Sequence, residues 1–94
     1  MKNKLYTFQE DLRERLKNPR FKKAWKEFEI EYMLAKQLID KRLAKKLSQR
    51  ELAKKTQTSQ AVISRLETMN ANPSLSLLKR IAQALNTKLI LQLK

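Results

Sequence analysis

The near absence of helix-breaking residues constrains this chain more than any other feature. It contains no glycine, and its only prolines are Pro19 and Pro73. Tight hairpin turns rely on glycine because their central residues take positive φ angles, so a chain without glycine disfavours antiparallel sheets. We therefore expect an all-α fold in which long helices are interrupted at only a few points.

Capping signals predict where the first two helices begin. Thr7 and Glu10 fit a capping box, and Asn18 before Pro19 fits an N-cap followed by the first turn of a second helix. Apolar residues then recur every three or four positions until about Lys45. Such a helix would span roughly 40 Å, more than the radius of so small a globule. Either the helix breaks in the middle or its first half projects. We expect a continuous or bent helix whose C-terminal half, from about Tyr32, belongs to the core of the following domain.

Two short helices separated by a three-residue turn follow in the second half. Ser48 and Glu51 form a capping box that predicts a helix over 49–55. Ser59 is placed to cap the next helix, which extends to about Thr68. Two helices joined by three or four residues are the geometry of a helix-turn-helix.

A last helix and a short strand complete the predicted fold. Ser74 is the expected N-cap of a helix with a regular apolar face, and Asn86 suits the left-handed residue after it. The final segment, Lys88–Lys94, is rich in leucine and predicts a β-strand. A lone strand lacks a hydrogen-bond partner, so it would pair with a second copy or join the edge of a partner's sheet.

The charge of the chain indicates a polyanionic partner. Lysine and arginine number 22 against 9 acidic residues, and residues 48–94 carry only two acids against eight cations. Such a positive charge would favour binding to nucleic acid or to an anionic membrane. No apolar run approaches the roughly 20 residues of a membrane span, and the N-terminus lacks the apolar segment of a signal peptide. We expect a cytoplasmic protein that does not enter membranes.

The missing residue types exclude several chemistries. There is no cysteine and no histidine, which excludes disulfides, thiolate or imidazole catalysis and the common zinc sites. We expect no cofactor and no metal.

The helix-turn-helix pattern also predicts which side chains meet DNA. Ala53 permits the close crossing of the two helices, and the exposed N-terminal end of the second helix should face base edges. Candidate base contacts are Gln60, Ala61, Ser64 and Arg65. Candidate phosphate contacts at helix ends and loops are Gln49, Ser59, Asn70 and Lys55, although a surface lysine such as Lys55 is more often only solvated.

The segment Ser48–Glu67, SQRELAKKTQTSQAVISRLE, resembles the helix-turn-helix of the lambdoid phage repressor and Cro (XRE) family. The resemblance continues through PSLSLLKRIAQALN and covers about residues 32–86. It implies a five-helix-like repressor domain with an ion pair between Arg42 and Glu67. Where the family usually has glycine, this chain has Lys46 and Gln57. Each must then take a positive φ at a cost of about 1 kcal/mol.

Residues 1–31 lie outside that domain, and either enlarge its core or form a protein-binding surface. The candidate partner-binding residues are Phe8, Leu12, Phe21, Trp25 and Phe28. The chain as a whole is similar to the antitoxins of HigBA-type toxin–antitoxin modules, which have an N-terminal helical extension, this motif and a leucine-rich end. The segments that carry this resemblance are FKKAWKEFEIEYMLAKQLIDKRLAKKLSQRELAKK and LNTKLILQL. It implies an antitoxin that neutralises a RelE/HigB-like ribonuclease toxin, forms a homodimer and represses its own operon.

This interpretation divides the chain into three parts and leaves competing functions. Residues 1–31 would bind the toxin, 32–86 would bind DNA, and 87–94 would build the dimer. The first alternative is a stand-alone repressor without a toxin. A ribonuclease of the RelE type would need a multi-stranded sheet, so we expect no enzyme. RNA binding would more often place aromatic residues on the basic surface, whereas here none follows Tyr32.

Overall fold

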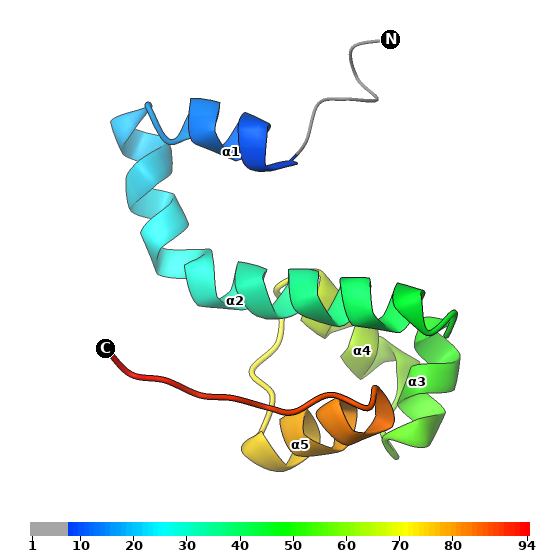
Figure 1. Ribbon diagram of the computed structural model, residues 1–94. Helices are drawn as coiled ribbons and strands as arrows, with labels where there is room; N and C mark the ends of the chain where they lie inside the picture. The colour runs from blue at the N-terminus through cyan, green and yellow to red at the C-terminus, as the bar shows by residue number, and fades with distance from the viewer. Residues whose placement is uncertain (1–7) are drawn as a thin grey trace, which may run out of the picture. The chain divides into compact units, whose positions relative to one another are not determined.

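The computed structural model describes residues 8–94, and within them it contains five α-helices and no strand (Figure 1). The helices are α1 (Phe8–Arg15), α2 (Pro19–Ala44), α3 (Gln49–Lys55), α4 (Gln60–Glu67) and α5 (Leu75–Ala84). The predicted all-α class is confirmed for this part of the chain. The chain forms two compact units that meet within α2, one ending at Ile30 and the other beginning at Glu31.

The first unit holds α1 and the first part of α2. Asn18 begins α2 as predicted, because its side-chain oxygen accepts a hydrogen bond from the amide of Arg20 at 2.9 Å. One turn further, the half-buried rings of Phe21 and Trp25 stack with centroids 6.5 Å apart. The capping box expected from Thr7 lies outside the described residues.

The second unit packs the rest of α2 with α3, α4 and α5 around one apolar core. Leu52 and Ile63 are completely buried, and Ala53 of α3 is only 3% exposed. The complete core cluster consists of Leu38, Leu52, Ala53, Ile63, Leu66, Leu77, Ile81 and Leu85. Full burial of one leucine or isoleucine stabilises the fold by about 1.5–3 kcal/mol. The positions of α3 and α4 therefore depend on side chains that the helix-turn-helix pattern supplies.

The predicted N-caps of the three short helices all form. The amide of Glu51 donates to the Ser48 hydroxyl at 3.0 Å, and the amide of Ser48 donates back to the Glu51 carboxylate at 2.7 Å. Ser59 and Ser74 cap α4 and α5 in the same way through their hydroxyl oxygens. Helix starts could be predicted because both partners of each cap lie within four residues.

Four helices end on a left-handed residue that is not glycine. These residues are Lys46, Gln57, Met69 and Asn86, with φ angles of 58°, 56°, 64° and 54°. After each, the next amide donates to a carbonyl five positions earlier, which is the Schellman arrangement. The bonds are Leu47 to Arg42, Thr58 to Ala53, Asn70 to Arg65 and Thr87 to Ala82. The positive φ predicted at Lys46 and Gln57 is therefore confirmed, whereas Met69 was not anticipated.

The strand predicted for Lys88–Lys94 is wrong for this chain, because these residues form neither helix nor strand. Strand-forming side chains are not enough, since a strand exists only when a neighbouring strand supplies its hydrogen bonds. Among residues 8–94 no other strand is available. Leu89 is half-buried in a groove beside α2 and α5, while Ile90, Leu91 and Leu93 are 75%, 67% and 102% exposed.

The described helices do not fit a membrane span, because none is long and apolar enough to cross a bilayer. Within the same residues no three acidic side chains come together in a way that could hold a metal ion.

Candidate nucleic-acid interface

The turn between α3 and α4 is held from inside the fold. Thr56 is completely buried, and its hydroxyl donates to the carbonyl of Leu52 at 2.8 Å. The carbonyl of Thr56 in turn accepts a hydrogen bond at 2.9 Å from Nε of Arg80 in α5. α5 therefore helps to set the angle between α3 and α4. Sequence reasoning missed both residues, because the pair is separated by 24 positions.

The structure brings the four candidate base-contacting residues together on one side of α4. Gln60, Ala61 and Arg65 are exposed and Ser64 is half-buried. These positions lie one turn apart in pairs, so they share a face opposite the buried Ile63. The side chains of Gln60 and Arg65 make no hydrogen bond or ion pair with any described residue. Their donor and acceptor groups are therefore available to a ligand.

The four candidate phosphate-contacting residues occupy different places. Ser59 and Asn70 are exposed at the two ends of α4, with Asn70 donating to the Thr68 hydroxyl at 3.2 Å. Gln49 is half-buried at the start of α3 and donates to Glu67 at 3.0 Å. Lys55 lies at the opposite end of α3, where it lines an open cleft beside α5. Three of the four therefore flank α4, and Lys55 stands apart from them.

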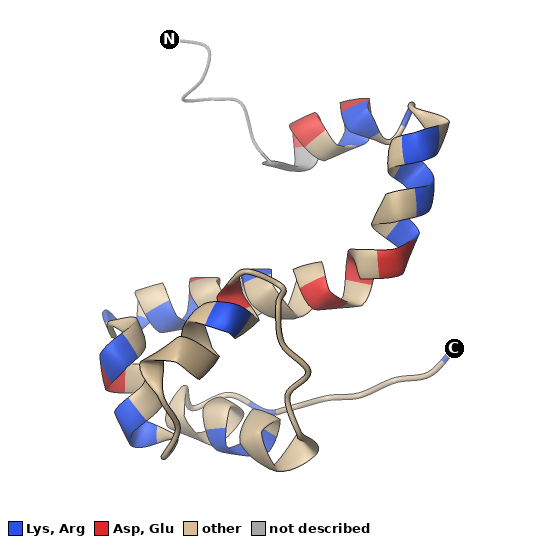
Figure 2. Ribbon diagram, turned by 180° about the vertical axis from the view of Figure 1, so that it is seen from behind, with Lys and Arg blue, Asp and Glu red and all other residues tan. Residues whose placement is uncertain are grey.

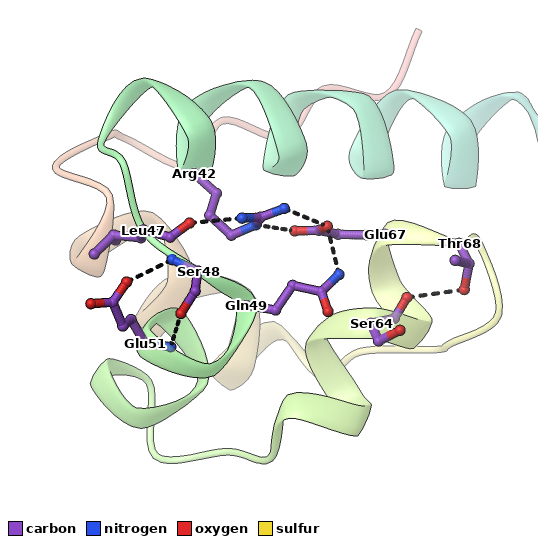
Figure 3. Close-up of polar contacts among 8 residues, drawn as sticks. All are labelled: Arg42, Leu47, Ser48, Gln49, Glu51, Ser64, Glu67 and Thr68. Carbon is purple, nitrogen blue, oxygen red and sulfur yellow. Dashed lines mark hydrogen bonds and ion pairs between the residues drawn. The ribbon is translucent and has the colours of Figure 1, made fainter.

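Arg42 and Glu67 form an ion pair that ties α2 to the end of α4 (Figure 3). Nε of Arg42 donates to one Glu67 oxygen at 2.6 Å, and a terminal nitrogen donates to the other at 3.0 Å. The remaining nitrogen donates to the carbonyl of Leu47 at 2.7 Å. The two side chains are only 11% and 5% exposed.

The ion pair also organises its surroundings. Gln49 donates to the same Glu67 carboxylate, so three elements meet at one acidic group: α2, the start of α3 and the end of α4 (Figure 3). The hydrogen bonds to Glu67 raise the pKa of Arg42 above its ordinary value, with Coulomb attraction adding to them and burial opposing them. The guanidinium therefore stays charged, and its ionic contact with Glu67 helps to hold the orientation of α4.

Acidic residues near the motif are few, and those present are engaged internally. From residue 48 onward the only acids are Glu51 and Glu67 (Figure 2). Hydrogen bonds from Ser48 lower the pKa of Glu51, and Glu67 faces Arg42. The cations of this region, by contrast, include the exposed Arg65 and Lys54. The field around α4 is therefore positive, which favours approach of a phosphate backbone.

This arrangement matches a known family. A family model described as helix-turn-helix (HTH_3) matches residues 38–91, which are 54 of the 94 residues of the chain. The chain belongs to this helix-turn-helix family and is a DNA-binding transcription regulator. Comparisons with curated proteins and with solved structures gave no match. The matched range includes α3, α4 and α5 but leaves out the first unit.

Proposed function

We propose that this protein represses transcription by inserting α4 into the major groove of an operator. The single observation that carries the proposal is the exposed face of α4, where Gln60 and Arg65 have no partner within the described residues. The opposite face is fixed by burial and by the Arg42–Glu67 pair. A rigid helix that presents free polar side chains in a positive field suits base recognition.

Each residue on that face has a distinct part in recognition. Arg65 suits bidentate contact with guanine, and Gln60 suits adenine, each worth about 1–3 kcal/mol of discrimination. Ser64 can hydrogen-bond to several base edges, and Ala61 fits against a thymine methyl group. Ser59, Gln49 and Asn70 then hold the backbone on either side and set the register of α4.

A comparison of two alanine variants tests this assignment. Arg65→Ala should relax specificity at one base pair in each half-site, because only that pair loses its bidentate partner. Lys55→Ala should weaken binding to every sequence about equally, because a phosphate contact carries no sequence information. Affinities are measured against a panel of operators with single substitutions. Identical profiles for the two variants would contradict the assignment.

We further propose that the protein acts as a homodimer built in part by residues 88–94. These residues follow the last described backbone hydrogen bond, from Thr87 to Ala82, and they expose Ile90, Leu91 and Leu93. Pairing with the same segment of a second copy would supply hydrogen bonds and bury these side chains. Two recognition helices would then reach half-sites about one helical turn apart.

Sedimentation at micromolar concentration tests the dimer. The full chain should sediment as a dimer, and a chain lacking residues 88–94 should be a monomer with the same helix content. A monomeric full chain would refute self-pairing. Pairing only with a partner's sheet would appear as a monomer that associates when that partner is added.

A more specific proposal is that the protein is an antitoxin whose first unit binds a ribonuclease of the RelE/HigB type. The supporting observation is that this unit is compact in itself and lies outside the family match. Phe28 is 52% exposed there, with Glu27 and Glu29 exposed beside it. Large aromatic side chains dominate interface energies when a partner buries them, and acids suit a basic ribonuclease.

The other candidate partner-binding residues of the first unit are less accessible than Phe28. Leu12, Phe21 and Trp25 are half-buried, and the side chain of Phe8 lies outside the described part. Residues 10–30 carry seven cations against five acids, so the unit as a whole is not acidic. The toxin contact is therefore centred on Phe28 and its acidic neighbours rather than spread over the whole unit.

Deletion of residues 2–30 tests the antitoxin proposal. The shortened chain should keep the helices of the second unit and bind its operator, because the core of that unit draws on none of the deleted residues. Binding to the protein encoded by the neighbouring gene should be lost, and Phe28→Ala in the full chain should weaken it strongly. Retention of tight binding by the shortened chain would contradict the proposal. A regulator without a toxin would bind no product of a neighbouring gene.

A further inference from the structure

The first turns of α2 carry a group of cations that the helix-turn-helix does not explain. Arg20, Lys22, Lys23 and Lys26, here called the basic patch, are all exposed. Figure 2 shows the first turns of α2 largely in the blue of lysine and arginine. None of the four makes a side-chain hydrogen bond or ion pair with any described residue. Cations close by in the same unit are paired instead, as in Arg15 with Asp11 and Lys17 with Glu14.

The basic patch opposes the stability of its own helix. Lys26 lies one turn from both Lys22 and Lys23, and like charges three or four positions apart destabilise a helix. The patch also occupies the N-terminal end of α2, where the helix dipole favours acids, and the first turn holds none. These costs disappear when a polyanion neutralises the cations.

We propose that the basic patch binds DNA phosphates outside the site read by α4, and so adds a sequence-independent contact. The proposal rests on DNA binding by the helix-turn-helix. Because the patch and the helix-turn-helix belong to one chain, a duplex bound at one place raises the local concentration at the other.

The decisive experiment compares two triple variants with equal loss of charge. Lys22→Gln/Lys23→Gln/Lys26→Gln removes three patch cations, and Arg13→Gln/Arg15→Gln/Lys17→Gln removes three from the same unit. Operator affinity is measured across a salt series. Each lost phosphate contact lowers the salt slope by about 0.9, so the patch variant should lose about 2–3 and the control less than 1. Equal changes, or no change, would overturn the proposal.

A variant that keeps the charges distinguishes loss of charge from an effect on folding. Replacing Lys22, Lys23 and Lys26 by arginine keeps the charges, so operator affinity and salt slope should stay within about twofold of wild type. Circular dichroism should show equal helix content in all variants. If the arginine variant binds as weakly as the glutamine variant, the loss does not come from charge and the proposal fails.

Trp25, the only tryptophan of the chain, provides a direct probe of the basic patch. Its emission should change and saturate when a duplex of scrambled sequence is added, and the change should be lost in the patch variant. Vesicles containing phosphatidylserine are titrated in parallel. A response to vesicles but not to duplex would overturn the proposal. If the wild type binds no duplex at all, the proposed function fails as well. If the wild type binds its operator and the patch variant keeps the same salt slope, only this inference fails.

Discussion

Replacing Glu67 by glutamine tests the contact on which the orientation of α4 depends. The substitution keeps the size of the side chain but removes its charge. Glu67 accepts two hydrogen bonds from Arg42 and one from Gln49. A glutamine oxygen can keep one side of this contact, but its amide nitrogen then faces a guanidinium N–H, donor against donor. Arg42 would remain charged and nearly buried without its counterion.

The expected cost follows from this burial. Removing one partner of a buried ion pair costs about 3–5 kcal/mol. We expect the lower value, about 3 kcal/mol, because Arg42 keeps its hydrogen bond to the Leu47 carbonyl. For a domain of this size, 1 kcal/mol shifts the melting temperature by about 4–8 °C. Glu67→Gln should therefore lower the melting temperature by about 12–24 °C.

Thermal unfolding followed by circular dichroism measures this shift, with Asp40→Asn as the matched control. Asp40 pairs with Lys36 on the same helix, but those side chains are 59% and 39% exposed. Its replacement should cost less than about 1 kcal/mol. Raising the salt should leave the effect of Glu67→Gln nearly unchanged, because buried charges are weakly screened. A shift of a degree or less, or one equal to that of the control, would refute this reasoning.

Other substitutions and conditions give smaller but equally definite expectations. Gln57→Gly should stabilise the fold by about 1 kcal/mol because it relieves a positive φ, whereas Lys54→Gly inside α3 should destabilise it by a similar amount; chemical denaturation compares them. Ser59→Ala should cost about 1 kcal/mol by the same assay, because α4 loses its N-cap. Hydrogen bonds from Ser48 lower the pKa of Glu51 in the folded protein. The stability that Glu51 contributes is therefore complete above its unfolded pKa near 4.5 and is lost as the pH falls through its folded pKa. Glu51→Gln should lessen that loss in acid titrations of stability. Operator affinity should fall with salt at a log–log slope of about −5 to −9 if six to ten phosphates are contacted.

The features that sequence predicted well are local in the chain. The N-caps at Ser48, Ser59 and Ser74 join atoms at most three residues apart, so the order of residue types is sufficient to predict them. The positive φ at Gln57 was expected from the resemblance, because the family usually has glycine there, and the Schellman ending gives the physical reason for it. The exposed face of α4 follows from helical periodicity alone.

The one structural error, the strand at Lys88–Lys94, has a non-local cause. Leucine and β-branched residues favour a strand, but the hydrogen bonds of a strand come from another segment. Among the described residues no segment can supply them. The same limitation hid the contact between Arg80 and Thr56, because nothing in either local pattern indicates the other.

The sequence by itself therefore determined that the chain is helical, where most of its helices begin, and that it carries a helix-turn-helix in a basic surrounding. Only the tertiary structure decided how α4 is held. The pair of Arg42 with Glu67, 25 positions apart, was expected only because the chain resembles a family that has it, and nothing in the sequence indicated that Gln49 reaches the same carboxylate from α3. Such contacts depend on packing around Leu52 and Ile63, whose burial brings distant helix faces together. Local propensities act within a few residues, whereas the position of a recognition helix is set by side chains that meet only after the core has formed.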